Sequence, residues 1–305
     1  MSIGTPFKLD SADLKKNFWS GYTDTPAFWK NVAPQVIPSS NGTETYRWLD
    51  TLSSFEDWTF KGEIPDAELN KHEDTWANKD LGRNMLIFDK ELRRDQTGMI
   101  RLRAQGLGAG YPAKQNSMLA TLMEGAAADK TKFDAQYFFD DDHPGLDAPG
   151  GASTTFDNSF ALDLTTDNLE TVVYTMQQYR LLNGELANVT PDTLVVPSQL
   201  QFTAKKIVNS LRVMEDANNA ENQLGFLNVV VYPSLTDTNK WYVLDNSKPI
   251  KPFFWQEELP LRVLSQEISK TNDEYIRGRR YRLSADASGC FGHSLWFLAA
   301  MSNPS

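Results

Sequence analysis

The sequence predicts an α+β protein with a long N-terminal arm and a loop-rich first third. Apolar residues recur at helical spacing over 166–183 and over 198–213, and short apolar runs typical of strands lie between and after them. The first forty-odd residues are instead rich in aromatic side chains and prolines and show no long helical period. A chain of 305 residues is long enough to bury a sizeable core.

Composition and charge narrow the class of protein. Hydrophobic residues make up 40% of the chain and charged residues 23%, as in ordinary soluble domains. No apolar run approaches the roughly 20 residues of a membrane span, and residues 1–16 lack the features of a signal peptide. We therefore expect synthesis in the cytoplasm and no membrane partner. Cys290 is the only cysteine, so no internal disulfide can form and a reducing compartment fits.

The net charge of −10 argues against tight nucleic-acid binding, because affinity for phosphates comes mainly from clustered Lys and Arg. One basic, aromatic stripe stands out, and it comprises Arg277, Arg279, Arg280 and Arg282 with Tyr275 and Tyr281. Such a stripe suits contact with a single strand. The same alternation is typical of an exposed strand or a contact between subunits, which is the interpretation we favour.

The N-terminal segment contains six large aromatic residues, unlike a free tail. They are Phe7, Phe18, Trp19, Tyr22, Phe28 and Trp29. We expect an arm that lies across a neighbouring subunit, with Phe18, Trp19, Phe28 and Trp29 as its anchors. A poorly ordered terminus is the alternative.

The next segment predicts a projecting hairpin. Short apolar pieces at 46–49 and 55–60 alternate with polar turns, and the charged stretch 61–79 has few apolar anchors. The run Met85 to Phe88 predicts a buried strand. This pattern favours a long exposed hairpin over a packed layer.

A helix is expected from Thr97, as its N-cap, to Gly125. Three glycines at 106, 108 and 110, followed by Pro112, predict a kink or a division into two parts. Residues 134–144 then resemble an aromatic strand that ends in a turn, and 145–159 a loop.

The second half of the chain alternates clearer elements. Helices are expected at 166–183, closing at Gly184, and at 198–213, with a short buried strand at 193–196 between them. Further strands are expected at 227–232, 241–244, 253–255 and 275–283, and the apolar run 295–301 should be buried.

Two groups of residues resemble sites of chemistry. The segment Asp140-Asp141-Asp142-His143 offers carboxylates and an imidazole for a cation, but a turn with Asp as an N-cap explains it better. Cys290 and His293 could form a catalytic pair of thiol and base, although they are more simply explained as loop and strand neighbours. No phosphate-binding loop or nucleophile elbow is present. We expect no catalytic, cofactor-binding or metal-binding residues.

Several motifs together resemble the Mu-like bacteriophage major head subunit family, and they occur in the family's order. They are Tyr46-Arg47-Trp48-Leu49, Asp57-Trp58, Gly62, Asp95-Gln96-Thr97-Gly98, Phe133-Asp134, Phe138-Phe139, His143-Pro144, Leu194-Val195-Val196-Pro197 with Leu200, Trp241-Tyr242-Val243-Leu244-Asp245, and Gly292 to Met301. The resemblance spans Tyr46 to Met301. Two features depart from the family pattern: Phe55-Glu56 replaces an arginine-rich stretch, and the long helix carries Gly and Pro.

The resemblance implies an HK97-type capsid fold. Its parts would be an N-terminal arm (1–45), an extended loop with flanking strands (46–94), a peripheral domain with a spine helix (95–187), an axial domain (188–272) and a return to the peripheral domain (273–305).

The implied function is that of a major capsid protein, which forms hexamers and pentamers in the icosahedral head of a tailed phage. Its partners would be further copies of itself and possible scaffolding, portal and decoration proteins. The shell would enclose double-stranded DNA without sequence-specific binding, which suits an acidic subunit. The protein would reside in the virion after assembly in the host cytoplasm.

Two other functions stay open at this point. An encapsulin-like nanocompartment shell would share the fold and enclose a cargo enzyme. A metal-dependent hydrolase would use the Asp140 to His143 segment.

Overall fold

The computed structural model describes residues 11–49, 71–88, 90–91, 98–126, 134–148, 150–181, 183–210, 222–268 and 280–304. The helices are α1 (Ser11–Asp24), α2 (Trp29–Val32), α4 (Met99–Gly125), α5 (Thr166–Gln177) and α6 (Gln201–Asn209), with short 3-10 turns η1 (Ser198–Leu200), η2 (Leu224–Phe226) and η3 (Trp296–Leu298). The strands are β1 (Gln35–Pro38), β2 (Thr43–Leu49), β3 (Lys71–Ala77), β4 (Lys79–Phe88), β5 (His143–Leu146), β6 (Ser153–Phe156), β7 (Ser159–Phe160), β8 (Thr193–Val196), β9 (Asn228–Val231), β10 (Trp241–Leu244), β11 (Phe253–Ile268), β12 (Arg280–His293) and β13 (Ala299–Ser302).

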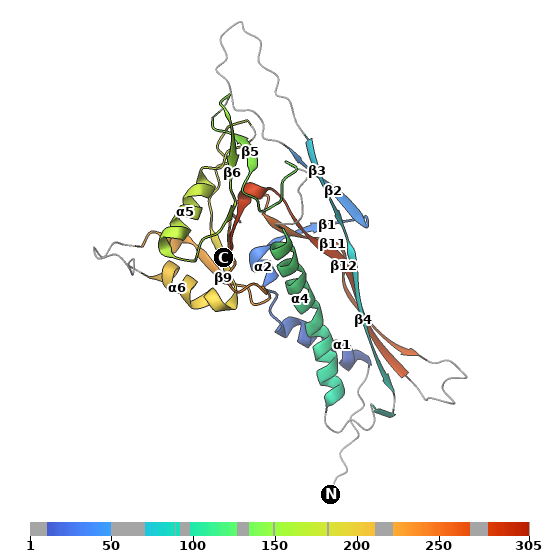
Figure 1. Cartoon of the computed structure of the whole chain (residues 1–305). Helices are drawn as coiled ribbons and strands as arrows, with labels where there is room; N and C mark the ends of the chain where they lie inside the picture. Colours follow the sequence, from blue (N-terminus) through green and yellow to red (C-terminus); the bar gives the residue numbers. More distant parts are fainter. Residues whose placement is uncertain are drawn as a thin grey trace.

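These elements form two main sheets, so the α+β prediction is confirmed. The first sheet has the order β1-β11-β12-β4, and the second has the order β7-β13-β10-β8-β9. Figure 1 shows α1 and α4 beside the first sheet, toward the right of the view, whereas α5 and α6 lie with the second sheet at the left. Two separate hairpins, β2–β3 and β5–β6, complete the fold.

The first sheet extends into a long antiparallel ribbon of β11, β12 and β4. Side chains alternate between its faces, so Leu283, Ala285 and Ile87 are buried on the face toward the helices. Leu264 of β11 and Leu86 of β4, the two strands that flank β12, remain exposed. The ribbon therefore has one face packed against α1 and α4.

Helices α1 and α4 pack unusually closely because glycines occupy their crossing. A Cβ atom at Gly108 would collide with the carbonyl oxygen of Phe18, and one at Gly21 with that of Gln105. The expected division of the long helix into two parts is wrong, since α4 runs without interruption from Met99 to Gly125 with Pro112 inside it. Packing against α1 explains Gly108, and tertiary contacts can outweigh the roughly 3 kcal/mol that an interior proline costs a helix.

The expected role of the N-terminal aromatics is wrong in part. Phe18 is fully buried in α1, together with Leu14, against residues of α4 and the ribbon. Trp29 is 4% exposed, and its backbone N–H donates to the Asn116 Oδ1 atom at 3.0 Å. Neither side chain is available to anchor a neighbour. The helical period of α1 is weak in the sequence, because only Leu14 and Phe18 mark its buried face.

The second sheet lies at the centre of the largest core. All four residues of β8 and of β10 are buried, as their apolar runs predicted. Helix α5 begins with Thr165 as its N-cap and buries Leu169, Val172 and Met176. The same core cluster includes Trp255 and Phe291 of the first sheet, so the two sheets share one interior.

Several predicted boundaries in the middle of the chain are wrong. Residues 134–142 form turns, and the strand begins at His143; residues 145–159, expected as a loop, contribute to the β5–β6 hairpin and β7. The helix expected to reach residue 183 ends at Gln177, because Tyr179 turns inward and its hydroxyl donates to the Asp157 carbonyl oxygen at 2.7 Å.

Later elements are mostly confirmed, with altered lengths. The helix expected at 198–213 is divided into η1 and α6, which ends at Asn209; residues 211–213 lie outside the described part. Strands β9 and β10 match their predictions, and the run 295–301 is almost wholly buried. Strand β11 reaches Ile268 and β12 reaches His293, because their alternating polar residues extend the pairing beyond the apolar runs.

The projecting hairpin is confirmed for its described strands, since β2 and β3 pair from Thr43↔Ala77 to Leu49↔Lys71. Its expected pieces at 55–60, and the part of the charged stretch before Lys71, lie outside the described residues. The same holds for residues 1–10, Thr97, Tyr275, Arg277 and Arg279. Among the described helices, none is both long and apolar enough to cross a membrane.

The predicted domain limits at residues 188 and 272 do not coincide with the two sheets. Strand β11 falls within 188–272 but belongs to the first sheet, whereas β13 follows residue 273 and belongs to the second. The chain therefore passes from the first sheet to the second, returns to the first with β11 and β12, and ends in the second with β13.

Candidate functional site

A buried polar cluster in the described structure centres on His143. Its Nδ1 atom lies 2.6 Å from Asp134 Oδ2, and both side chains are completely buried. The imidazole ring stacks on Trp296 with centroids 4.0 Å apart and planes only 2° from parallel. Its other nitrogen, Nε2, lies 3.2 Å from Asn158 Oδ1. Contacts to both ring nitrogens and to one face of the ring therefore fix the position of the His143 side chain.

Asn158 fixes the orientation of this imidazole. Its amide nitrogen donates to the carbonyl oxygens of Phe138, Trp296 and Ala299 at 2.8 to 3.2 Å. Its Oδ1 atom therefore faces His143, so Nε2 donates the proton in that contact. Because Nδ1 faces Asp134, both ring nitrogens already have a polar partner within the chain. The arrangement locks the 134–143 turns to the C-terminal segment.

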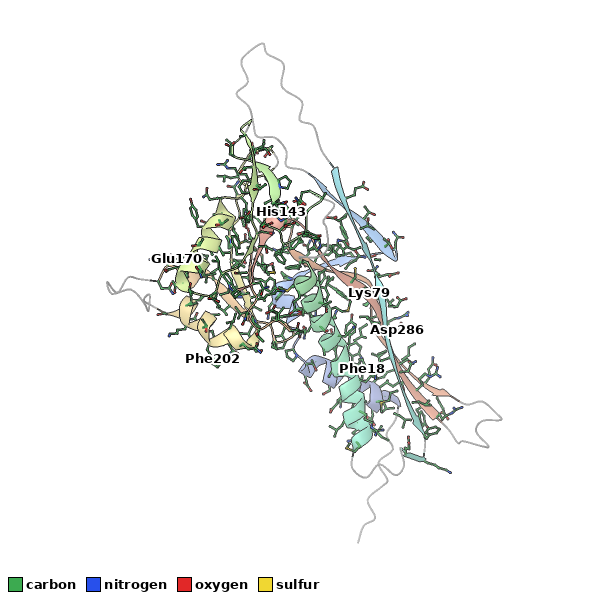
Figure 2. The ribbon with its side chains drawn as sticks, in the orientation of Figure 1. Phe18, Lys79, His143, Glu170, Phe202 and Asp286 are labelled. Atoms are coloured by element: carbon green, nitrogen blue, oxygen red, sulfur yellow. The ribbon has the colours of Figure 1, made fainter. Side chains whose placement is uncertain are left out.

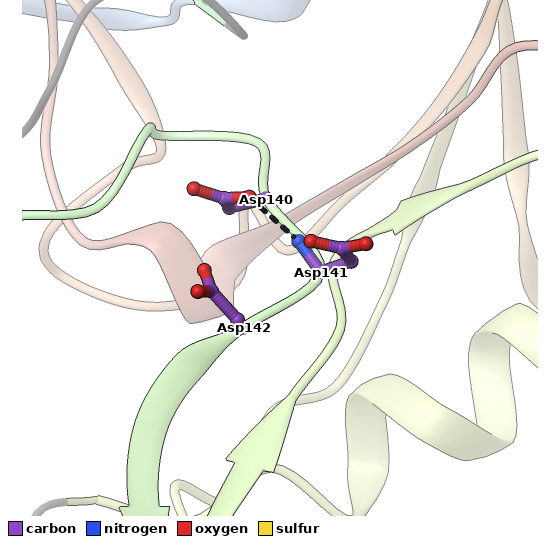
Figure 3. A group of neighbouring side chains, drawn as sticks. All are labelled: Asp140, Asp141 and Asp142. Carbon is purple, nitrogen blue, oxygen red and sulfur yellow. Dashed lines mark hydrogen bonds between the residues drawn. The ribbon is translucent and has the colours of Figure 1, made fainter.

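The three aspartates beside His143 do not form the four-residue metal site considered from the sequence. A carboxylate oxygen from each of Asp140, Asp141 and Asp142 falls within 4.8 Å of the others. Figure 3 shows them on one tight turn, where Asp140 accepts the backbone N–H of Asp141 at 2.9 Å. Asp140 also accepts the N–H of Tyr137 at 3.0 Å. Turn formation, the favoured interpretation, accounts for Asp140, and His143 points into the core instead.

Cys290 and His293 do not form a nucleophile and base. They are three residues apart on β12, so their side chains leave opposite faces of the strand. Burial raises the pKa of the Cys290 thiol to about 11, which disfavours the reactive thiolate. Burial lowers the pKa of His293 to about 3. Both residues are therefore neutral groups of the interior at neutral pH.

The base of the β2–β3 hairpin is bound to the first sheet by polar and aromatic contacts. The Tyr46 hydroxyl donates to the Gln256 Oε1 atom at 2.7 Å, and the Gln256 amide donates to the Asn78 Oδ1 atom at 2.7 Å. Trp76 packs edge-on against His293, with centroids 4.7 Å apart. No local pattern predicts this junction, because Gln256 lies 178 and 210 residues along the chain from these two partners.

Large apolar side chains are exposed on the layer that contains the second sheet. Phe202 of α6 is 79% exposed, Tyr174 of α5 is 64% exposed and Phe226 of η2 is 55% exposed. Figure 2 places Phe202 on the outer side of α6, away from the core. Exposed aromatics of this size are typical of surfaces that contact another protein. From the sequence, this role was expected of the N-terminal aromatics instead.

A sequence comparison assigns the chain to a family. The sequence model described as the Mu-like prophage major head subunit gpT matches residues 9–161, 158–235 and 233–305. The Mu-like prophage FluMu major head subunit of Haemophilus influenzae is 21% identical over 286 residues, which make up 93% of this chain and 68% of that protein. The major capsid protein of Escherichia phage Mu is 26% identical over 158 residues, about half of each chain.

Solved structures with a similar fold come from phage capsids and from a virus-like particle. The procapsid protein of bacteriophage JBD30 matches with a TM-score of 0.55 and 20% identity, over 96% of this chain and 75% of that chain. A virus-like particle from Pyrococcus furiosus matches with a TM-score of 0.54 and 11% identity, over 95% and 98%. The fold is thus the HK97-type capsid fold that the motifs predicted. Because the family model matches almost the whole chain, this protein belongs to the Mu-like prophage major head subunit family.

Proposed function

We propose that this head subunit closes into hexamers and pentamers, which tile an icosahedral shell around the genome of a tailed phage. The observation that carries the proposal is the match of the family model from residue 9 to residue 305. Rings of this kind use heterologous contacts, in which two different surfaces of each copy meet. Many modest contacts then give a stable shell through multivalency.

The two sheets provide a basis for the domains of the shell subunit. We assign the first sheet with α1 and α4 to the peripheral domain, and the second sheet with α5 and α6 to the axial domain. The spine helix is then α4, and the β2–β3 hairpin carries the extended loop. Exposed Phe202, Tyr174 and Phe226 supply apolar contact area on the axial layer. This assignment differs from the predicted limits at residues 188 and 272.

The expected partners follow from the same role. Further copies of the chain form the shell, and scaffolding, portal and decoration proteins would attach to it. The enclosed double-stranded DNA would be held without sequence-specific contacts, which agrees with a net charge of −10. The protein is expected in the virion, with assembly in the cytoplasm of the bacterial host.

A second candidate is the shell of a cellular nanocompartment. The likeness to a virus-like particle named for the cellular organism Pyrococcus furiosus favours it, although at 11% identity that likeness concerns the fold alone. The contents of purified particles separate the two functions. Double-stranded DNA of genome length supports the phage head, whereas a single protein cargo supports the compartment.

Assembly itself is tested by the mass of the purified full-length chain in sedimentation velocity. We expect species of five or six copies or larger closed particles. The double variant Phe202→Ser with Phe226→Ser removes two exposed aromatic side chains. It should remain folded by circular dichroism and shift the distribution of masses toward the monomer. A wild-type chain that stays monomeric both alone and with the products of its flanking genes would overturn the proposal.

A further inference from the structure

Two Asn-Gly pairs occur in the chain, at Asn41-Gly42 and at Asn183-Gly184. In such a pair the backbone nitrogen of the glycine can attack the carbonyl carbon of the asparagine side chain, because glycine has no Cβ atom to hinder the approach. The reaction requires a backbone N–H that is not engaged elsewhere and a side chain that can rotate toward it. The structure gives the two pairs opposite surroundings.

Asn183-Gly184 is held in an unreactive arrangement. The Gly184 N–H donates to the Leu181 carbonyl oxygen at 2.8 Å, and the φ angle of Gly184 is 84°. The Asn183 side chain is engaged at both ends, because Oδ1 accepts the Glu185 N–H at 3.0 Å and Nδ2 donates to Glu185 Oε2 at 3.2 Å. Neither reacting group is therefore free to meet the other.

Asn41-Gly42 leaves both reacting groups free. Asn41 is exposed, and its only side-chain hydrogen bond to the described part of the chain is a long one, from Nδ2 to Glu44 Oε1 at 3.4 Å. Among the described residues, none accepts the Gly42 N–H. Apart from the two chain neighbours, a Cβ atom added to Gly42 would meet no atom within 4 Å. The Asn41 side chain therefore has room to turn toward the Gly42 nitrogen.

The backbone of this turn, by contrast, is bound to the base of the β2–β3 hairpin. The Asn41 carbonyl oxygen accepts the Ser39 hydroxyl at 2.7 Å and the Asn78 side-chain N–H at 2.9 Å. The Asn41 N–H donates to Glu44 Oε1 at 3.2 Å. Asn78 continues the connection inward, because its Oδ1 atom accepts the Gln256 amide. A change in the backbone at Asn41 therefore affects the contacts that hold the hairpin base.

We propose that Asn41 is a site of spontaneous deamidation through a cyclic imide formed with Gly42. A bond forms between the Gly42 nitrogen and Asn41 Cγ, and the Cγ–Nδ2 bond breaks. The Gly42 amide proton leaves with the side-chain amide group as ammonia. Water then opens the imide at one of its two carbonyl groups, which yields aspartate at position 41 or its β-linked isomer. The reaction consumes only water, and it does not depend on shell assembly.

Both products weaken the turn, for different reasons. Hydrogen bonds from the Ser40 N–H and the Ser39 hydroxyl lower the pKa of Glu44, so its carboxylate is charged at neutral pH. A second carboxylate at position 41 repels it. In the β-linked isomer the backbone runs through the former side chain, so the carbonyl group that accepts the Asn78 amide leaves the main chain. The hairpin base should therefore loosen as the protein ages, most of all in the β-linked form.

Deamidation is tested by incubating the folded full-length chain at pH 8 and 37 °C and locating modified residues by peptide mass spectrometry. Each event replaces an amide group with a hydroxyl group and so changes the mass of the peptide. We expect Asn41 to react at least tenfold faster than Asn183, and the difference to disappear in guanidinium chloride, where both pairs are unfolded. Equal rates in the folded chain would overturn the proposal. A difference that persists in the unfolded chain would show that the fold does not set the rates, which overturns the structural argument.

Two variants separate the chemistry from its effect on the hairpin. Gly42→Ala places a methyl group in open space, so it should not lower the melting temperature, yet it should slow deamidation of Asn41 at least tenfold. Equally fast deamidation in this variant would contradict attack by the Gly42 nitrogen. Asn41→Asp reproduces the charge of the product without the β-linkage.

Melting temperatures of fresh and incubated samples measure the effect of the products. The incubated wild type should melt at a lower temperature than fresh Asn41→Asp, whereas incubated Gly42→Ala should melt as it does when fresh. An incubated wild type that is deamidated at Asn41 and yet as stable as the fresh protein would contradict the effect on the hairpin base.

Discussion

Tyr46 and Gln256 connect the projecting hairpin to the body of the subunit. The Tyr46 hydroxyl donates to the Gln256 Oε1 atom at 2.7 Å across 210 residues of sequence. Gln256 is completely buried, and its amide nitrogen engages Asn78 on the other side of the hairpin base. The ring of Tyr46 also packs edge-on against Phe254, with centroids 5.1 Å apart. One buried amide thus fixes both strands of the hairpin where they leave the sheet.

Loss of this hydrogen bond should loosen the hairpin. Tyr46→Phe leaves the Gln256 oxygen buried without its donor, and we expect the free energy of unfolding to fall by about 1–2 kcal/mol. Urea denaturation measures the change. Thr45→Val is the matched control on the same strand, because it removes only an exposed contact to Thr75. If Tyr46→Phe lowers the free energy of unfolding no more than Thr45→Val does, other contacts must hold the base of the hairpin.

Two glycines of α4, one at the crossing with α1 and one outside it, should change the stability of the chain in opposite directions when replaced by alanine. Gly108→Ala places a methyl group against the Phe18 carbonyl and should destabilise the chain by about 1–3 kcal/mol. Gly106→Ala, two residues away in open space, should stabilise it by about 0.5–1 kcal/mol. Thermal unfolding of both variants tests the close crossing. The same sign of change for both would contradict it.

His293 should make the subunit sensitive to acid. Its folded-state pKa is about 3 against 6.5 for the free group, so the unfolded chain binds the extra proton between these values. The associated stability is fully present above pH 6.5 and is lost as the pH falls toward 3. The loss is about 1.4 kcal/mol per pH unit, or about 2 kcal/mol at pH 5.

The variant His293→Phe isolates this effect. Phenylalanine keeps an aromatic ring between Trp76 and Phe138 but binds no proton. We expect its free energy of unfolding, measured in urea at pH 7 and pH 5, to change less than that of the wild type. Identical pH dependence in the two proteins would show that another group carries the acid sensitivity.

Asn158 should be more important for stability than any exposed asparagine. Asn158→Ala removes the partners of three buried carbonyl oxygens and of His143, so we expect a loss of at least about 3 kcal/mol. Asn303→Ala changes an exposed side chain near the C-terminus and should have little effect. Chemical denaturation of both variants measures the difference. A small loss at Asn158 would refute the role assigned to this network.

The sequence predicted the elements that depend on neighbouring residues. It missed those that depend on contacts between residues far apart in the chain. Runs of consecutive apolar residues predicted β8 and β10 because burial on both faces needs no alternation. The long ends of β11 and β12 alternate polar and apolar residues, and only their pairing reveals them as one ribbon. Pro112 misled the prediction for α4, because its cost is offset by packing against a helix that the sequence did not reveal.

The same distinction applies to the functional surfaces. The motifs predicted the family and the fold because they are local and occur in a fixed order along the chain. His143 resembled a surface ligand because three aspartates precede it, whereas its partners Asn158 and Trp296 are distant in sequence. Arg83 of β4 lines one groove together with Arg103 and Lys114 of α4, and these residues become neighbours only when β4 lies along α4. No local pattern contains that information.

Shell formation is best tested by electron microscopy of particles made in bacteria from the full-length chain, co-expressed with its flanking genes. We expect closed shells with fivefold and sixfold rings, in which the layer of β8, β10 and β13 lies nearest each ring axis. A chain that purifies from those cells only as a monomer would contradict the proposed assembly, and particles whose rings place that layer at their outer edge would contradict the axial assignment.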